Sequence, residues 1–118
     1  MKESESKIIL EEYFYSNGNI EFSVETYNGK KHGKATYWDD LGNLINEVDY
    51  KMDKIDGLWI SYYISGNVKY RSNYLENKRH GLMIEYYPDG KQKKITTYES
   101  DNEITSITFD MHGNKIEN

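Results

Sequence analysis

Apolar and polar residues alternate with a period of two along most of the chain, and short turn-like segments interrupt the alternation. One clear unit runs from an alternating segment at 58–63 through a turn at 64–66 to a second alternating segment at 67–74. A period of two is typical of half-buried antiparallel strands. No apolar period of about 3.6 residues persists long enough to predict a helix. The pattern therefore predicts an all-β chain made of hairpins.

Glycines recur at nearly constant intervals and divide the chain into similar units. One series has intervals of 24, 24, 24 and 23 residues and consists of Gly18, Gly42, Gly66, Gly90 and Gly113. A second series has intervals of 24 residues and consists of Gly33, Gly57 and Gly81. A fixed period of this kind is the signature of a repeat protein. We therefore interpret residues 1–118 as one domain with repeats at about 9–32, 33–56, 57–80, 81–103 and, in part, 104–118.

The turn in each repeat predicts which residues face each other. Pro88-Asp89-Gly90 favours a type I turn closed by a left-handed glycine, and a linker at 75–80 is expected between hairpins. Counting back from this turn gives an apolar face and a polar face. The pairs predicted for the apolar face are Phe14 with Ile20, Leu10 with Val24, Tyr62 with Val68, Ile60 with Tyr70, and Leu58 with Ser72. Those predicted for the polar face are Trp59 with Arg71, Ser61 with Lys69, and Glu85 with Lys93.

Hairpins joined in this way should stack into one elongated, twisted antiparallel sheet of about nine or ten strands. No helix or second sheet is predicted to cover its apolar face. Three arrangements remain open: the sheet coils around its own aromatic side chains, two copies pair, or a partner covers the face. The apolar fraction of 36% agrees with a thin architecture rather than a deep core.

Composition narrows the class of partner. The net charge of −5 argues against nucleic acid, which normally binds a basic surface. The charge changes along the chain, from −5 over 1–59 to +4 over 60–98 and −4 over 99–118. Such bands either steer a partner or reflect solvated surfaces. No window is apolar enough for a membrane span, so we expect a cytoplasmic protein without a membrane partner.

Candidate chemistry is sparse, and we expect neither an enzyme nor a bound cofactor. There is no cysteine, which excludes disulfides and thiolate metal sites. His32 and His80 occupy the same place in different repeats, about 19 Å apart at the usual strand spacing, which is too far for a shared metal. Carboxylate neighbours such as Glu11-Glu12 and Asp39-Asp40 lack an obvious enclosed site that would shift a pKa.

Aromatic and basic residues are the candidates for binding. An aromatic residue stands four positions before each turn glycine, and this column consists of Phe14, Trp38, Tyr62, Tyr86 and Phe109. The column either packs the sheet or presents Trp38, Tyr62 and Tyr86 to a partner. Packing requires the opposite face less, so that face adds the partner-binding candidates Trp59, Tyr63, Tyr87 and Arg71. A basic column either forms a solvated edge or binds an anionic surface, and it consists of Lys30, Lys54 and Lys78, with Arg79 beside it.

These motifs resemble the MORN repeat. The resemblance is carried by Asn28-Gly29-Lys30-Lys31-His32-Gly33, by Asn77-Lys78-Arg79-His80-Gly81, and by the paired aromatics before Gly66 and Gly90. More closely, the chain looks like the bacterial MORN variant in YwqK-like antitoxins. That resemblance implies a hairpin array with a binding role and a protein toxin as partner. Other MORN arrays act as scaffolds, homodimerisation modules or proposed lipid binders, and these remain alternatives.

Overall fold

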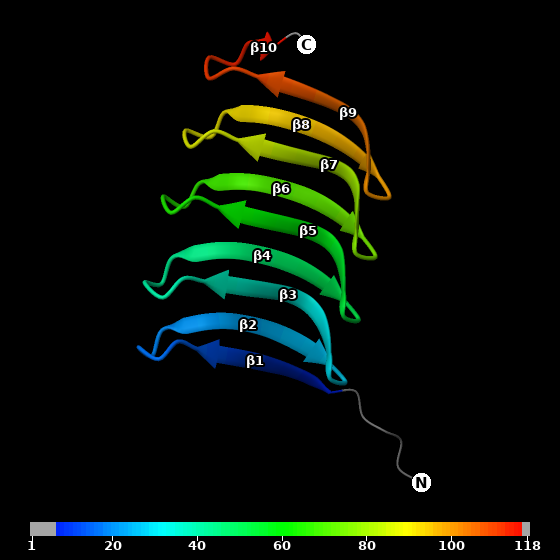
Figure 1. Cartoon of the computed structure of the whole chain (residues 1–118). Helices are drawn as coiled ribbons and strands as arrows, with labels where there is room; N and C mark the ends of the chain where they lie inside the picture. The colour runs from blue at the N-terminus through cyan, green and yellow to red at the C-terminus, as the bar shows by residue number, and fades with distance from the viewer. Residues whose placement is uncertain (1–6, 117–118) are drawn as a thin grey trace.

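The computed structural model describes residues 7–116 and places them in one antiparallel sheet of ten strands that follow one another in sequence order (Figure 1). The strands are β1 (Ile8–Phe14), β2 (Ile20–Tyr27), β3 (Lys30–Trp38), β4 (Leu44–Lys51), β5 (Lys54–Tyr62), β6 (Val68–Leu75), β7 (Lys78–Tyr86), β8 (Gln92–Glu99), β9 (Asn102–Phe109) and β10 (Lys115–Ile116). The predicted all-β repeat array is confirmed. The predicted domain also includes residues 1–6 and 117–118, which lie outside the described residues.

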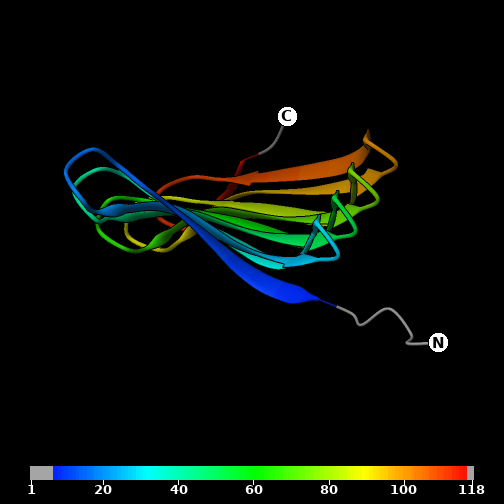
Figure 2. The same ribbon diagram turned by 90° about the horizontal axis from the view of Figure 1, so that it is seen from below.

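The sheet is a single twisted layer. Its principal extents are 65 × 36 × 15 Å, and all ten strands belong to the same sheet, so no second sheet packs against it within residues 7–116. Seen from below, the strands twist progressively and no second layer covers them (Figure 2). The described strands therefore leave both faces of the sheet without a covering layer.

Wide turns join the two strands of each hairpin at one end of the sheet. In the first of them, the Gly18 amide donates to the Tyr15 carbonyl and the Tyr15 amide donates to the Asn19 carbonyl. Gly18 is left-handed, with φ of +92°. The same pair of hydrogen bonds recurs in the turn between Tyr87 and Lys91. This is the glycine-closed type I turn that the sequence predicts there.

Tight turns join successive hairpins at the other end, and the predicted linker at 75–80 is wrong. Only Glu76 and Asn77 separate β6 from β7, and both have positive φ, 46° and 71°. These angles are those of a type I′ hairpin turn. The Asn77 amide donates to the Ile55 carbonyl of the preceding repeat, and Asn77 Oδ1 accepts from the Ile55 amide. This exchange across repeats holds the left-handed turn in place.

A β-bulge displaces the predicted strand register by one residue. Tyr62 does face Val68 as predicted, but Ile60 faces Arg71 instead of Tyr70. Lys69 is an extra residue on β6 that has no partner on β5, so every later pair shifts. The first repeat has the same irregularity: Phe14 faces Ile20 as predicted, and the pairs beyond it are shifted by one residue. The other corrected pairs are Leu10 with Glu25, Leu58 with Asn73, Trp59 with Ser72, Ser61 with Tyr70, and Glu85 with Lys94.

The shift also changes which face is buried. Seven residues of the described chain are buried, and the register puts all of them on one side: Val24, Thr26, Ala35, Val48, Ser61, Ser72 and Thr96. We call this side the packed face. The other side, the open face, carries the aromatic column of Phe14, Trp38, Tyr62, Tyr86 and Phe109. The aromatic column, which the sequence places on an apolar face, therefore lies opposite the side that holds the buried residues.

Ser72 lowers the stability of the packed face, and a substitution there can raise it. Its side chain is 2% exposed, and its hydroxyl has no hydrogen-bond partner among the described residues. Valine occupies the equivalent places at Val24 and Val48. Because an unpaired buried polar group costs about 1–3 kcal/mol, we expect Ser72→Val to stabilise the fold by about 1–2 kcal/mol. Thermal unfolding measures this, and Ser72→Ala controls for loss of the hydroxyl without added methyl groups. A lower midpoint for Ser72→Val would contradict the assignment.

Candidate protein-interaction surface

The open face brings together four of the residues predicted to bind a partner. Trp38, Tyr62 and Tyr86 lie in its aromatic column, and Arg71 lies in the row next to them. Trp59, by contrast, lies on the packed face, where its ring is 5.9 Å from that of Tyr74. The predicted pairing of Trp59 with Arg71 is wrong because the bulge puts these two side chains on opposite faces.

The central row of the open face changes character halfway along the sheet. On the first four strands it is polar and consists of Glu12, Ser23, Thr36 and Glu47. From β5 to β9 it consists of Ile60, Arg71, Ile84, Ile95 and Ile107. We call its four isoleucines the isoleucine row. These side chains are half-buried, and neighbouring Leu82 is 46% exposed. The row spans about 19 Å at the usual strand spacing, as an apolar strip that Arg71 on β6 interrupts.

Tyr62 links the aromatic column to the polar half of the open face. Its hydroxyl donates to Glu47, whose carboxylate also pairs with Lys34 at 3.6 Å. Burial, and then the hydrogen bond to Glu47, raise the pKa of Tyr62 to about 12. The phenol therefore stays protonated at neutral pH and keeps donating. Glu47 therefore has two partners within the chain, the hydrogen-bond donor Tyr62 and the cation Lys34.

Tyr63 and Tyr87 have a structural role at the wide turns. The Tyr63 hydroxyl donates to the Tyr86 carbonyl at 2.7 Å, and the Tyr87 hydroxyl donates to the Phe109 carbonyl at 2.7 Å. Tyr15 makes the equivalent bond to the Trp38 carbonyl at 2.6 Å. The expectation that the second tyrosine is free for contact does not hold for these hydroxyl groups, since each ties one repeat to the next.

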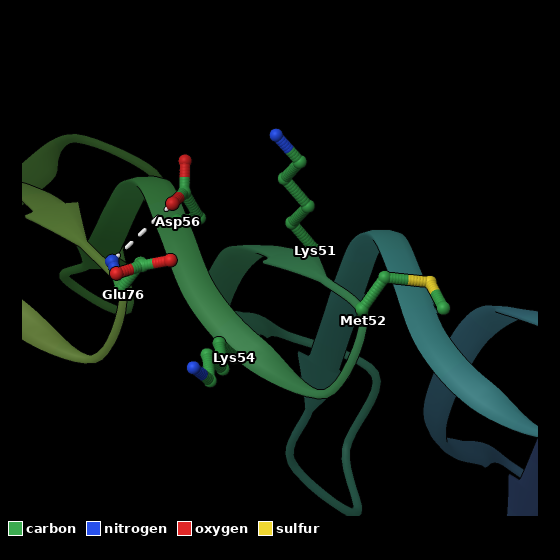
Figure 3. Close-up of a pocket in the computed structure, with 5 residues that line it drawn as sticks. All are labelled: Lys51, Met52, Lys54, Asp56 and Glu76. Atoms are coloured by element: carbon green, nitrogen blue, oxygen red, sulfur yellow. Dashed lines mark hydrogen bonds between the residues drawn. The ribbon is translucent and has the colours of Figure 1, made fainter.

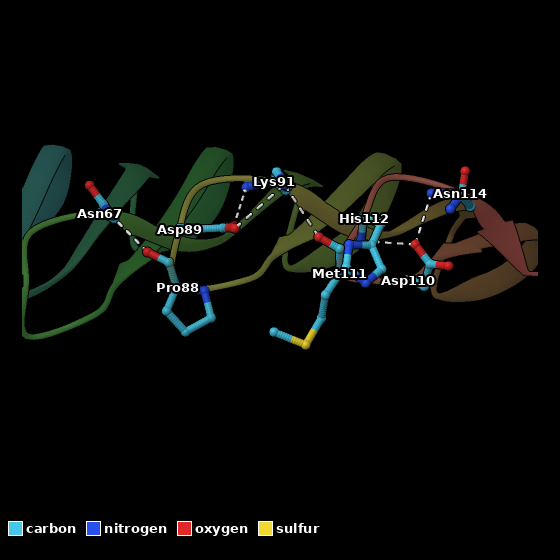
Figure 4. A network of polar contacts seen from close by, with 8 residues as sticks. All are labelled: Asn67, Pro88, Asp89, Lys91, Asp110, Met111, His112 and Asn114. Carbon is cyan, nitrogen blue, oxygen red and sulfur yellow. Dashed lines mark hydrogen bonds and ion pairs between the residues drawn. The ribbon is translucent and has the colours of Figure 1, made fainter.

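Asp39 takes the place of this tyrosine in the second repeat and caps its own turn. Its Oδ1 accepts from the Leu41 and Asn43 amides at 3.0 and 2.8 Å. The hydrogen bond from the Asn43 amide is the main reason that the pKa of Asp39 is lowered. The wide turns are otherwise bridged to their neighbours: Asn67 Nδ2 donates to the Pro88 carbonyl, and Lys91 Nζ donates to the Met111 carbonyl (Figure 4).

Removing one tyrosine hydroxyl should weaken the contact between two neighbouring repeats. We expect Tyr63→Phe to destabilise the fold by about 1 kcal/mol, because the Tyr86 carbonyl loses a donor while the ring remains. Denaturant titration measures the change. Tyr70→Phe is the matched control, because the Tyr70 hydroxyl donates no hydrogen bond to any of residues 7–116. Equal stabilities of the two variants would exclude the proposed role of the hydroxyl.

The basic column lies at the tight turns and is interleaved with carboxylates. Lys30, Lys54 and Lys78 are exposed at the first positions of β3, β5 and β7. Arg79 lies 4.3 Å from the Tyr98 ring centroid, and its Nε is 3.3 Å from Asp101 Oδ1. A shallow hollow of about 190 Å³ beside this edge contains charges of both signs, from Lys51, Lys54, Asp56 and Glu76, together with Met52 (Figure 3). The edge is therefore mixed in charge rather than uniformly basic.

The histidines take part in the turns between repeats. His32 on β3 and His80 on β7 lie four strands apart, as predicted. The Nδ1 atom of His32 accepts from the Met52 amide at 3.2 Å, and that of His80 accepts from the Ser100 amide at 3.4 Å. No metal-binding cluster of histidine and acidic residues occurs within residues 7–116. The same residues include no helix that could span a membrane.

A second concave region, missed by the sequence reasoning, lies on the packed face near the first strands. It is a groove of about 460 Å³ lined by Tyr13, Phe22, Tyr37, Lys31, Glu11 and Glu21. The Phe22 ring lies 4.6 Å from the Tyr37 ring, and Lys31 Nζ lies 5.8 Å from the Phe22 centroid. Lys31 therefore already covers the aromatic wall of this groove. Only the corrected register groups these side chains on one face.

Comparison with known families agrees with the repeats. The MORN repeat variant family matches residues 31–52, 55–76 and 79–100, which together are more than half of the chain. No curated protein gives a significant match. The three matched segments are consecutive, and each contains one wide turn and most of the strands on either side of it. The chain therefore belongs to the MORN repeat variant family.

Proposed function

We propose that this protein is a non-enzymatic binding module whose partner protein covers the open face. The observation that carries the proposal is the isoleucine row, which lies beside Trp38, Tyr62 and Tyr86 and is covered by none of residues 7–116. Contiguous apolar surface on a folded protein marks an interaction site. Tyrosine, tryptophan and arginine are also enriched where binding energy concentrates. MORN repeats in general are binding modules, which supports the same assignment.

The size of the face suits a protein partner. A standard interface takes about 800 Å² from each partner. The sheet measures 65 × 36 Å, so part of one face is enough. The isoleucine row is flat and open, unlike the enclosed sites that hold small ligands. A broad partner surface therefore fits this face better than a small molecule does.

A second copy of the chain fits the open face less well. Consider two copies that pair through their open faces about a two-fold axis parallel to the strands. If the axis lies over β7, it exchanges β6 with β8, so Arg71 of each copy would lie against Ile95 of the other. A pair centred on β5 would bring Arg71 to Glu47, but it would lay the isoleucine row over the polar strands β1–β3. Neither arrangement satisfies both the charge and the apolar surface, which favours a different protein.

The finer form of the proposal is that the partner is a toxin, which this protein neutralises by masking its surface. The support is the resemblance of the repeat motifs to those of small antitoxins built of such repeats. The test begins with affinity capture from the source cells, and the captured protein is then purified and mixed with this chain. A stoichiometric complex that protects the open face supports binding. If none of the purified candidates bound this chain, the binding proposal would be overturned.

The toxin form needs its own experiment. The gene that encodes the purified partner is expressed in a bacterial host, with and without the gene for this chain. We expect growth arrest by the partner alone and normal growth when the two are expressed together. A partner that binds but never impairs growth would overturn the toxin form, and it would leave the protein-binding proposal standing.

A further inference from the structure

We infer that Arg71 is the anchor of the open face and that the partner meets it with the carboxylate of an aspartate or glutamate set among apolar side chains. The inference rests on the proposed function, because it states what chemistry the partner must offer at this face.

Arg71 lies inside the apolar strip. Its cross-strand neighbours in the central row are Ile60 on β5 and Ile84 on β7. The side chain is exposed, whereas these two isoleucines are half-buried. Any partner that covers Ile60 and Ile84 together must therefore also cover the guanidinium between them.

Arg71 has no partner within the described chain. It makes no ion pair, hydrogen bond or ring contact with any of residues 7–116. Arg79, the only other arginine of the sequence, pairs with Asp101 and stacks on Tyr98. One arginine is therefore fully engaged and the other is not. The bulge at Lys69 produces this difference, because it turns Arg71 away from the aromatic rings of the packed face.

The nearest acid of the same row is unavailable to Arg71. Glu47 lies two strands away, about 10 Å at the usual strand spacing, and it is bound by Lys34 and Tyr62. The chain thus neutralises the acidic side chain that borders the apolar strip and leaves the basic one exposed. Charge complementarity at this face therefore calls for an anion from outside the chain.

Covering the isoleucine row would be costly without such an anion. Removing an unpaired charge from water is strongly unfavourable, whereas a carboxylate that binds the guanidinium in bidentate geometry offsets this loss. A lipid phosphate has similar chemistry. The same face, however, carries the carboxylates of Glu12, Glu25 and Asp49, and the whole chain has a net charge of −5. An anionic membrane would be repelled by them, so we assign the carboxylate to a protein.

A peptide library tests this chemistry without the natural partner. Random peptides of about twelve residues are displayed on yeast, selected for binding to the labelled wild-type protein, and depleted of those that bind Ile84→Glu. We expect the enriched peptides to share an aspartate or glutamate among apolar residues. Their binding should fall at least tenfold for Arg71→Gln, whereas Lys54→Gln, which removes an exposed charge from the tight-turn edge, should change it less than twofold.

A charge exchange then identifies the contact. Arg71→Glu should abolish binding of an enriched peptide, and changing the shared acid of that peptide to lysine should restore at least a tenth of the original affinity. Enriched peptides that bind Arg71→Gln as tightly as wild type would overturn the inference, and so would a library that yields no open-face binder. Binding to vesicles that contain anionic lipid is measured in parallel. If wild type bound them and Arg71→Gln did not, the anion that meets Arg71 would be a lipid phosphate instead of a protein carboxylate. A natural partner whose binding is lost in Ile84→Glu but unchanged in Arg71→Gln would overturn this inference and leave the proposed function standing.

Discussion

Gly57→Ala will destabilise this protein much more than Gly81→Ala, although the two glycines occupy the same place in successive repeats. Both have left-handed backbones, with φ of +120° and +98°, so alanine at either site carries a common strain of about 1–2 kcal/mol. The difference lies in the neighbouring side chain. A Cβ on Gly57 would lie 2.8 Å from Asp49 Oδ2 and 2.9 Å from Asp49 Cβ, whereas a Cβ on Gly81 would lie 3.6 Å from Asn73 Cβ.

The added cost at Gly57 comes from two sources. Asp49 Oδ2 accepts a hydrogen bond from the Leu58 amide at 3.0 Å, and moving the carboxylate to make room would break it. The close contact with Asp49 Cβ requires the backbone of β4 or β5 to shift as well. We expect Gly57→Ala to cost about 3 kcal/mol or more in the free energy of unfolding, about twice the cost of Gly81→Ala. Denaturant unfolding of the two variants measures this, and equal losses would show that the strain of the left-handed backbone, not the contact with Asp49, determines the need for glycine.

Ile84→Glu will weaken binding of the partner protein at least a hundredfold while leaving the fold largely intact. Ile84 lies in the middle of the isoleucine row, next to Arg71 and Ile95. A carboxylate there would be buried by the partner at a cost of about 3–5 kcal/mol. In the free protein the new carboxylate is half-exposed and faces Arg71 across the strands, so the fold tolerates it.

Ile64→Glu is the matched control for this experiment. It makes the same chemical change at a wide turn, where the side chain is 77% exposed and lies off the open face. Affinity is measured by calorimetry with the purified partner, and thermal unfolding checks that both variants are folded. If Ile64→Glu and Ile84→Glu weakened binding equally, the open face would not be the binding surface.

The periodic residues made most of the fold predictable. The glycine series predicts the hairpins, and the turn at Pro88-Asp89-Gly90 correctly predicts the pair of Tyr62 with Val68. The bulge could not be predicted, because Lys69 is an ordinary strand residue and nothing local marks it as extra. The tight turn at Glu76-Asn77 was missed for another reason. Its left-handed residues are held by hydrogen bonds to Ile55 of the preceding repeat, which are tertiary contacts.

The candidate surface was predictable only in part. The aromatic column picks out Trp38, Tyr62 and Tyr86 by their spacing alone, and the structure places them on one face. The isoleucine row has no such signal. Ile60 and Ile84 are 24 residues apart, but Ile95 and Ile107 join them only through the strand register, in which a shift of one residue moves a side chain to the other face. The same shift explains why Arg71 was assigned to the wrong face.

The most direct test of partner binding through the open face is an NMR measurement on isoleucine methyl groups. A soluble paramagnetic agent broadens methyl signals that are accessible to solvent. In the free protein it should broaden Ile60, Ile84, Ile95 and Ile107, which all lie on the open face. With saturating purified partner, these four should become protected, while Ile64 at the wide turn stays broadened. Protection of Ile64 without protection of the row, or protection of the row in the free protein at high concentration, would contradict the account.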